Sequence, residues 1–238
     1  MDPIKAVLVF CATLFFVLSP LMSGGFGGFD PAQFPVPQEN PPVQPAGYAF
    51  AIWGPIYLGL LVSAGYGLFA RGRDGAWEAT RLPLILSLGP GAAWIGVAQL
   101  SPVWATVLIW WMLACALVAL ARSPHRDRWL LQAPVAVYAG WLTAAAWVSV
   151  GLIGAGHGEV LDETGWAILS LAGALGTGAA MQTRLRRAPE YGAAIVWALI
   201  GVVVANAGDH FAVAVLAAMG AVLIGTLALR FIKIAPAE

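Results

Sequence analysis

Eight long apolar stretches dominate this sequence and decide what it can fold into. They are residues 6–22, 48–70, 82–100, 103–121, 129–154, 165–181, 191–207 and 211–229. A helix needs about 17–25 apolar residues to cross the hydrocarbon layer of a membrane. Only 10% of the 238 residues are charged, whereas an average soluble domain has about 25%. The pattern predicts an all-α integral membrane protein with about eight transmembrane helices.

The basic residues give an independent check on this helix count. All 12 Lys and Arg residues lie before the first stretch or after the second, fourth, sixth and eighth. The alternate loops carry acidic residues instead, among them Asp30, Glu163 and Asp209. The positive-inside rule places the basic side in the cytoplasm, so both termini are expected there. Because Arg outnumbers Lys, we expect a bacterial protein of the inner (cytoplasmic) membrane.

Several classes of function find no support in the residues. The net charge is zero, so no basic face for nucleic acid is predicted. The predicted spans hold no charged residue, which argues against a carboxylate proton relay or a voltage sensor. Phosphate-loop and hydrolase motifs are missing. His157 and His210 lie near acidic residues but without the spacing of metal ligands, so neither a catalytic nor a metal site is predicted.

Tryptophan is the residue type that points to a ligand. The chain has 11 tryptophans, several times the number that average usage would give. Trp77, Trp129 and Trp166 fall at helix ends, where an aromatic belt at the membrane surface explains them. Others, such as Trp94 and Trp141, lie within the predicted helices. Such rings either pack against lipid or line a slot for a flat, apolar ligand.

Two further features leave alternatives open. Small residues such as Gly173 and Ala217 cluster in the sixth and eighth stretches, which allows close packing within the bundle or across a homodimer seam. The longest loop, residues 23–46, is rich in glycine in its first half and in proline in its second. It is either a plain connector or a lid over the outer mouth of the bundle.

Residues 45–57 resemble a known motif. They read Pro-Ala-Gly-Tyr-Ala-Phe-Ala-Ile-Trp-Gly-Pro-Ile-Tyr. The tryptophan-rich sensory protein family, also called the TspO/MBR or translocator protein family, opens its second helix with a similar Pro-Pro-Gly-Trp-x-Phe-Gly-Pro-x-Trp-x-x-x-Tyr pattern. Pro45, Gly47 and Phe50 match this pattern directly. Trp53 and Tyr57 match it after a deletion of one residue.

Weaker similarities to the same family follow along the chain. Trp94 looks like the tryptophan of the third family helix, and residues 134–141 look like the proline-to-tryptophan stretch of the fifth. Residues 191–201 are similar to a segment of longer family members. Gly91 and Ser149 stand where the family has asparagines, so we expect polar recognition of a ligand to differ here.

The resemblance implies a five-helix core, residues 1–154, followed by a three-helix C-terminal extension, residues 155–238. It also implies a pocket for a porphyrin, another haem-like tetrapyrrole or a sterol-like lipid, in a protein that often forms dimers. Carried over from the family, the ligand-binding residues are Tyr48, Phe50, Trp53, Tyr57, Trp94, Trp141, Ala145 and Ser149.

Three functions are compatible with this reading. The first is a membrane sensor, receptor or transport protein that binds a tetrapyrrole or another planar apolar molecule. The second is a non-catalytic accessory subunit of a larger membrane complex, for example a pigment–protein complex. The third is an enzyme that acts on the pigment itself, although no acid, base or metal is evident to carry that reaction. Lipid is an expected partner in every case.

Overall fold

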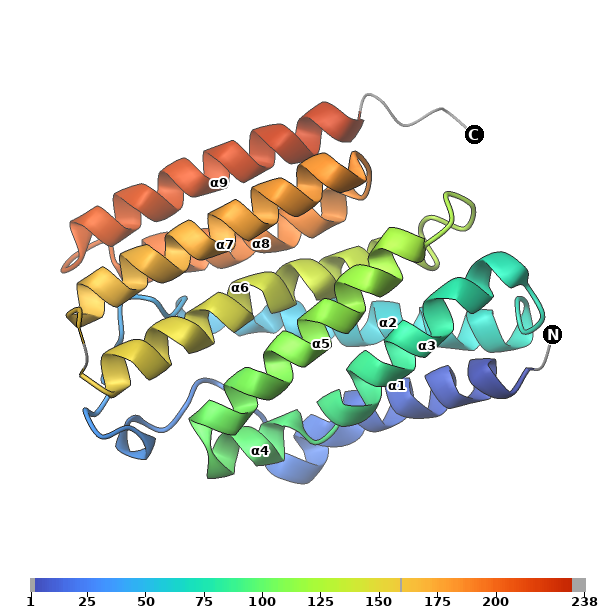
Figure 1. Ribbon diagram of the computed structural model, residues 1–238, viewed down its shortest axis with the longest axis horizontal. Helices are drawn as coiled ribbons and strands as arrows, with labels where there is room; N and C mark the ends of the chain where they lie inside the picture. The colour runs from blue at the N-terminus through green and yellow to red at the C-terminus, as the bar shows by residue number, and fades with distance from the viewer. Residues whose placement is uncertain (1–2, 159, 233–238) are drawn as a thin grey trace.

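The computed structural model describes residues 3–158 and 160–232, which form an elongated bundle of helices (Figure 1). The elements are α1 (Ile4–Ser23), η1 (Pro31–Gln33), η2 (Gly47–Ile52), α2 (Trp53–Phe69), α3 (Gly75–Gly91), α4 (Trp94–Leu100), α5 (Pro102–Arg122), α6 (Gln132–Gly156), α7 (Glu163–Leu185), α8 (Pro189–Ala205) and α9 (Phe211–Ile232). No strand occurs among these described residues. Seven helical segments are long and apolar enough to cross a membrane, and α8 is apolar but shorter, at 17 residues. The all-α membrane fold with about eight spans is therefore confirmed.

The third predicted span differs from expectation at its start and in its middle. It begins at Gly75 instead of residue 82, and it breaks after Gly91, so that α3 and α4 together make one crossing. Arg81 marked a loop in the sequence, but its side chain is only 3% exposed. The guanidinium donates hydrogen bonds to the carbonyl oxygens of Arg71 and Gly72. A buried charge that finds such partners can lie inside a helix.

Helix α6 is the most buried of the long helices and contacts α2, α5, α7 and α8. Polar side chains join it to its neighbours at two buried points. The Tyr138 hydroxyl lies 3.0 Å from Ser87 of α3, and the Tyr191 hydroxyl of α8 lies 2.9 Å from Thr143. Each pair satisfies polar atoms that have no access to water, as a buried polar group requires.

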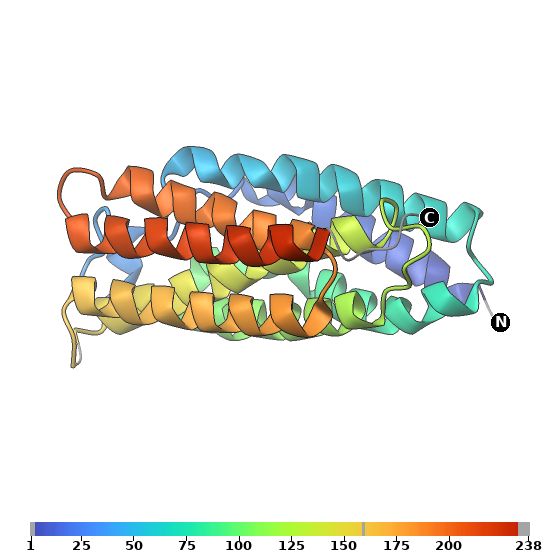
Figure 2. The ribbon, with the colours of Figure 1, turned by 90° about the horizontal axis from the view of Figure 1, so that it is seen from above.

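Helices α7 and α8 pack along this central helix. Helix α9 lies against both α7 and α8 (Figure 2). Small residues make these contacts close: Ala217 is fully buried, and a Cβ atom at Gly173 would lie 2.4 Å from the Trp147 ring. Gly173 and Ala217 therefore serve packing within the bundle, and the homodimer seam stays a prediction. The division into residues 1–154 and 155–238 stays a prediction.

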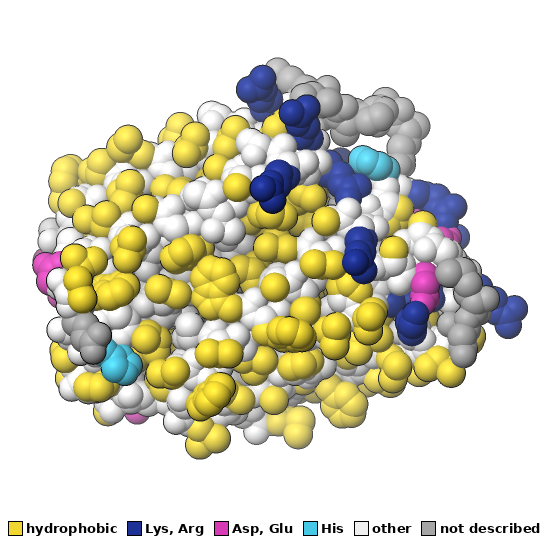
Figure 3. Space-filling model, viewed as in Figure 1, with side chains coloured by type: hydrophobic (Ala, Val, Ile, Leu, Met, Phe, Trp, Pro, Cys, Tyr) yellow, Lys and Arg dark blue, Asp and Glu magenta, His cyan; other side chains and the backbone are white. Residues whose placement is uncertain are grey.

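The charged side chains in view lie at the two ends of the bundle, and hydrophobic side chains cover the surface between them (Figure 3). Helix α1 begins and α9 ends at the basic end, where the α2–α3, α5–α6 and α7–α8 connections also lie (Figure 1). One residue assigned to the aromatic belt does not belong there. Trp77 is 3% exposed, and its indole N–H donates to Asp127 over 3.0 Å. The explanation of Trp77 as a membrane-surface anchor was therefore wrong.

Candidate functional site

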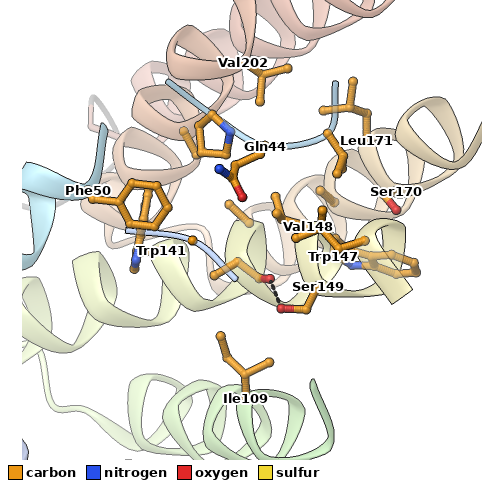
Figure 4. A pocket seen from close by; sticks show the side chains of 18 of the residues that line it. Gln44, Phe50, Ile109, Trp141, Trp147, Val148, Ser149, Ser170, Leu171 and Val202 are labelled. Carbon is orange, nitrogen blue, oxygen red and sulfur yellow. Dashed lines mark hydrogen bonds between the residues drawn. The ribbon is translucent and has the colours of Figure 1, made fainter. Parts of the chain in front are cut away.

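A cavity of about 60 Å³ lies inside the bundle between α5, α6, α7, α8 and the 23–46 loop (Figure 4). We call it the inner cavity. A second space of about 180 Å³, the α1 cavity, is lined by residues from α1 through α6. Four side chains line both spaces: Phe26, Phe50, Trp94 and Ile109. These side chains form the partition between the two cavities.

The structure brings most of the residues implied by the family resemblance to these two spaces. Five of them line the inner cavity: Phe50, Trp94, Trp141, Ala145 and Ser149. Trp53 and Tyr57 line the α1 cavity. Tyr48 lines neither cavity, since it is 45% exposed and its ring packs edge-on against Trp197 at 5.7 Å.

A chain of aromatic contacts holds the pocket residues in place. The Trp197 N–H on α8 donates to the Ala49 carbonyl oxygen over 2.8 Å, which fixes η2 against α8. The next residue, Phe50, then meets Trp141 of α6 edge-on at 5.9 Å. Trp53 also meets Trp141 edge-on, at 6.2 Å. Edge-to-face pairs at these distances are favourable, so these contacts stabilise the position of the aromatic wall.

The glycine-rich half of the 23–46 loop fills the mouth of the pocket with two phenylalanines. Phe26 contacts Trp94 edge-on at 4.7 Å, and Phe29 contacts the same ring at 6.3 Å. Gly24, Gly25 and Gly28 have φ angles of 75°, 80° and 133°, which side chains other than glycine rarely adopt. These turns direct both rings inward, and both residues line the inner cavity.

The two halves of this loop are held differently. The proline-rich half is bonded to the bundle by its backbone, with Val36 N–H to the Gly156 carbonyl, Ala46 N–H to the Gly201 carbonyl, and the Asn206 amide to the Pro42 carbonyl. The glycine-rich half is linked to α4 through two side chains, Gln33 and Gln99. Phe26 and Phe29 are therefore attached mainly by ring contacts.

Few polar groups reach the inner cavity, and none of its lining residues is charged. The Trp94 N–H is already used, since it donates to the Ala105 carbonyl over 2.9 Å. Ser149 donates to the Ala145 carbonyl one turn earlier, over 3.0 Å. Ser170 and Gln44 also line the cavity. The site can therefore bury an apolar molecule and offer it a few neutral hydrogen-bonding groups.

Three groups of lining residues were not foreseen from the sequence. They come from the glycine-rich loop (Phe26, Phe29), from the proline-rich loop (Val43, Gln44, Pro45) and from α7 and α8 (for example Ser170, Leu171, Ile195, Ala198). The family resemblance did not reach α7, and in α8 it indicated a similar segment, residues 191–201, without naming a ligand-binding residue. For the loop, the sequence does offer a signal. Phe26 and Phe29 are large apolar residues set among glycines outside the predicted spans, which indicates rings that pack back onto the bundle.

Comparison with known proteins gives a single kind of match. No curated protein and no solved structure matches the chain. The family model described as "TSPO-like protein" matches residues 29–230. This range includes α7, α8 and every lining residue of the inner cavity except Phe26 and Gly28. This chain belongs to the TSPO-like protein family.

Proposed function

We propose that the protein is a membrane sensor or carrier that binds a planar apolar molecule, such as a tetrapyrrole or a lipid, between α6, α8 and the 23–46 loop. Membership of the TSPO-like family suggests a sensor or translocator role. One observation supports ligand binding above the others: Phe50 and Trp141 present aromatic faces to an uncharged cavity inside the bundle. Aromatic surfaces of this kind favour flat apolar ligands.

The size of the cavities sets a condition on this function. Sites for drug-sized ligands typically have volumes of about 300–1,000 Å³, whereas the inner cavity has about 60 Å³ and the α1 cavity about 180 Å³. Even when merged, the two spaces stay below this range, so a tetrapyrrole also needs the side chains between them to move out. Phe26 stands in the partition between them and belongs to the weakly attached half of the loop. We propose that withdrawal of Phe26 and Phe29 opens the site, so that the loop acts as a lid.

Titration with protoporphyrin tests the proposal directly. The purified protein in lipid nanodiscs should show saturable quenching of tryptophan fluorescence at micromolar ligand. Trp141→Ala removes one aromatic wall of the inner cavity and should raise Kd about tenfold, which corresponds to about 1.4 kcal/mol. Trp104→Ala is the control, because Trp104 is 66% exposed on α5 and lines neither cavity.

Two results would contradict the proposal. One is linear, non-saturating quenching, which reports partition of the porphyrin into lipid. The other is an equal change in Kd for Trp141→Ala and Trp104→Ala, which would place the ligand outside the bundle.

A further inference from the structure

Ser170 of α7 carries a hydroxyl group that the fold itself does not use. The residue is 1% exposed, and its Oγ has no hydrogen-bond partner in the described part of the chain. Other hydroxyls in the bundle donate to the carbonyl oxygen four residues earlier, as Thr13, Thr143 and Ser149 do. A buried hydroxyl without a partner is unfavourable. Its position on the wall of the inner cavity offers it a partner from a ligand.

The Gln44 side chain approaches the same cavity from the 23–46 loop (Figure 4). Its backbone N–H bonds to the Pro41 carbonyl, but among the described residues its amide group has no hydrogen-bond partner. The amide rests against Gly28, where a Cβ atom would lie 3.0 Å from Nε2 and 3.1 Å from Oε1. Because Gly28 has no side chain, the Gln44 amide can occupy this space.

Gly151 of α6 is the point where α7, which carries Ser170, and the 23–46 loop, which carries Gln44, come close to each other. A Cβ atom at Gly151 would lie 2.7 Å from the Ser170 Oγ and 2.9 Å from the Val43 side chain. Val43 precedes Gln44 in the chain. The unused hydroxyl of α7 and the unused amide of the loop therefore border one cavity at the same end of α6.

We propose that Ser170 and Gln44 form a hydrogen-bonding subsite for one uncharged polar group, a carbonyl or a hydroxyl, of an otherwise apolar ligand. Hydroxyl and amide groups both donate and accept hydrogen bonds, so either ligand group can be satisfied. A carboxylate is excluded, because the cavity lining contains no cation and an unpaired buried charge is strongly unfavourable. This inference rests on the proposed function and specifies that the ligand group held at this subsite is neutral, so the propionates of a porphyrin would have to lie outside the inner cavity.

A matched set of small planar probes tests the subsite. Fluorene, fluorenone and fluorene-9-carboxylate share one ring system and differ by the absence of a polar group, a carbonyl and a carboxylate. Binding is measured by tryptophan quenching in nanodiscs, corrected for partition of each probe into protein-free nanodiscs. We expect fluorenone to bind about five- to tenfold more tightly than fluorene, as one buried hydrogen bond allows, and the carboxylate to bind worst.

Variants assign that preference to the two side chains. Ser170→Ala and Gln44→Leu should each reduce the preference for fluorenone over fluorene, and saturable binding of fluorene shows that the variants are folded. Thr183→Val is the matched control, because this hydroxyl lies at the exposed end of the same helix and donates to the Ala179 carbonyl. The carbonyl stretch of bound fluorenone should move to lower frequency in the wild-type protein and return in Ser170→Ala.

The possible failures are separable. Saturable binding of fluorene without preference for fluorenone would overturn the subsite and leave the proposed function standing. A preference that survives both Ser170→Ala and Gln44→Leu would overturn it as well. Absence of saturable binding by all three probes and by protoporphyrin would overturn the subsite together with the proposed function.

Discussion

At the scale of the residue, Gly140 sets how closely α6 and α8 approach. A Cβ atom at this position would lie 2.2 Å from the Tyr191 carbonyl oxygen and 2.9 Å from the Ala194 Cβ. The first neighbour is backbone, so it cannot rotate away. The close approach brings the fully buried Tyr191 within 2.9 Å of Thr143, and it also fixes α8 as a wall of the inner cavity.

Gly140→Ala should therefore destabilise the protein. The added methyl group forces α8 away from α6, and overpacking of this kind typically costs about 1–3 kcal/mol. We expect a lower midpoint of thermal unfolding for the detergent-purified protein, together with weaker ligand binding. Gly176→Ala is the control, because no atom lies within 4 Å of a Cβ at that helical position. Equal stability of the two variants would contradict the close α6–α8 contact.

At the scale of the element, we propose that the glycine-rich half of the 23–46 loop controls entry to the pocket. The double variant Phe26→Ala, Phe29→Ala removes the ring contacts with Trp94 and leaves the backbone bonds of the proline-rich half in place. We expect protoporphyrin to associate at least several-fold faster, as measured by stopped-flow quenching. Phe211→Ala, at a residue 73% exposed at the start of α9, should leave the rate unchanged. A slower or unaltered association in the double variant would rule out the lid.

A second element-scale device joins two connections at the basic end. Asp127 of the α5–α6 loop accepts hydrogen bonds from Arg71 of the α2–α3 turn over 2.8 Å and 3.1 Å. It also accepts one from the Trp77 indole, and its side chain is only 11% exposed. The hydrogen bond from Arg71 lowers the pKa of Asp127 most, partial burial opposes this, and Trp77 and Arg126 lower the pKa further.

The lowered pKa gives a definite dependence of stability on pH. A carboxylate whose pKa falls on folding stabilises the protein above its unfolded pKa, about 3.9 for Asp, and this contribution is lost as pH falls through the folded pKa. Asp127→Asn should thus lower the unfolding midpoint near neutral pH, with a difference from wild type that shrinks below about pH 4. Asn tolerates the positive φ of 57° at this position. Glu39→Gln, in an exposed loop, should show no such difference, and a gap that persists at low pH would contradict the assignment.

The positions of the helices could be predicted from the sequence wherever the need to cross the hydrocarbon layer alone determines them. Apolar length located the crossings. The predicted stretch 103–121, for example, lies within α5, which begins at Pro102 after Ser101, whose side chain accepts from the Trp104 N–H. The start of α3 was missed because Arg81 is buried by bonds to backbone carbonyls. A hydropathy pattern assigns an arginine to a loop, because it contains no information about hydrogen-bond partners that are distant in space.

The candidate site was predictable only in part, for a related reason. The motif at residues 45–57 and the ring of Trp141 pointed to one aromatic wall. The opposite wall depends on contacts across long sequence separations, such as Trp197 with Ala49 and Asn206 with Pro42. No periodicity within a uniformly apolar helix says which face meets a cavity, so Ser170 of α7 could be recognised only in three dimensions.

At the scale of the whole molecule, charge orients the bundle. Basic side chains gather at one end, whereas acidic and histidine side chains are in view at both ends (Figure 3). Of the ion pairs in the described residues, all lie among the α1 start, α3, the α2–α3 and α5–α6 connections and the start of α8, at the basic end. The positive-inside rule then leads us to propose that this end is cytoplasmic and that the mouth covered by Phe26 and Phe29 faces outward.

Thiol labelling tests this orientation and the helix count together. In a background with Cys11 and Cys115 replaced by alanine, Ala76→Cys reports on the basic end, at the start of α3. Gly208→Cys reports on the other end, between α8 and α9, where the added side chain meets no atom within 4 Å. A membrane-impermeant maleimide applied to intact bacterial cells expressing the protein should label only Gly208→Cys, and should label both after permeabilisation. Labelling of Ala76→Cys alone would invert the molecule and turn its pocket mouth to the cytoplasm. Labelling of both in intact cells would put residues 76 and 208 on the same side of the membrane. It would contradict the odd number of crossings, from α3 to α8, that separates them here and that the alternation of charge along the chain supports.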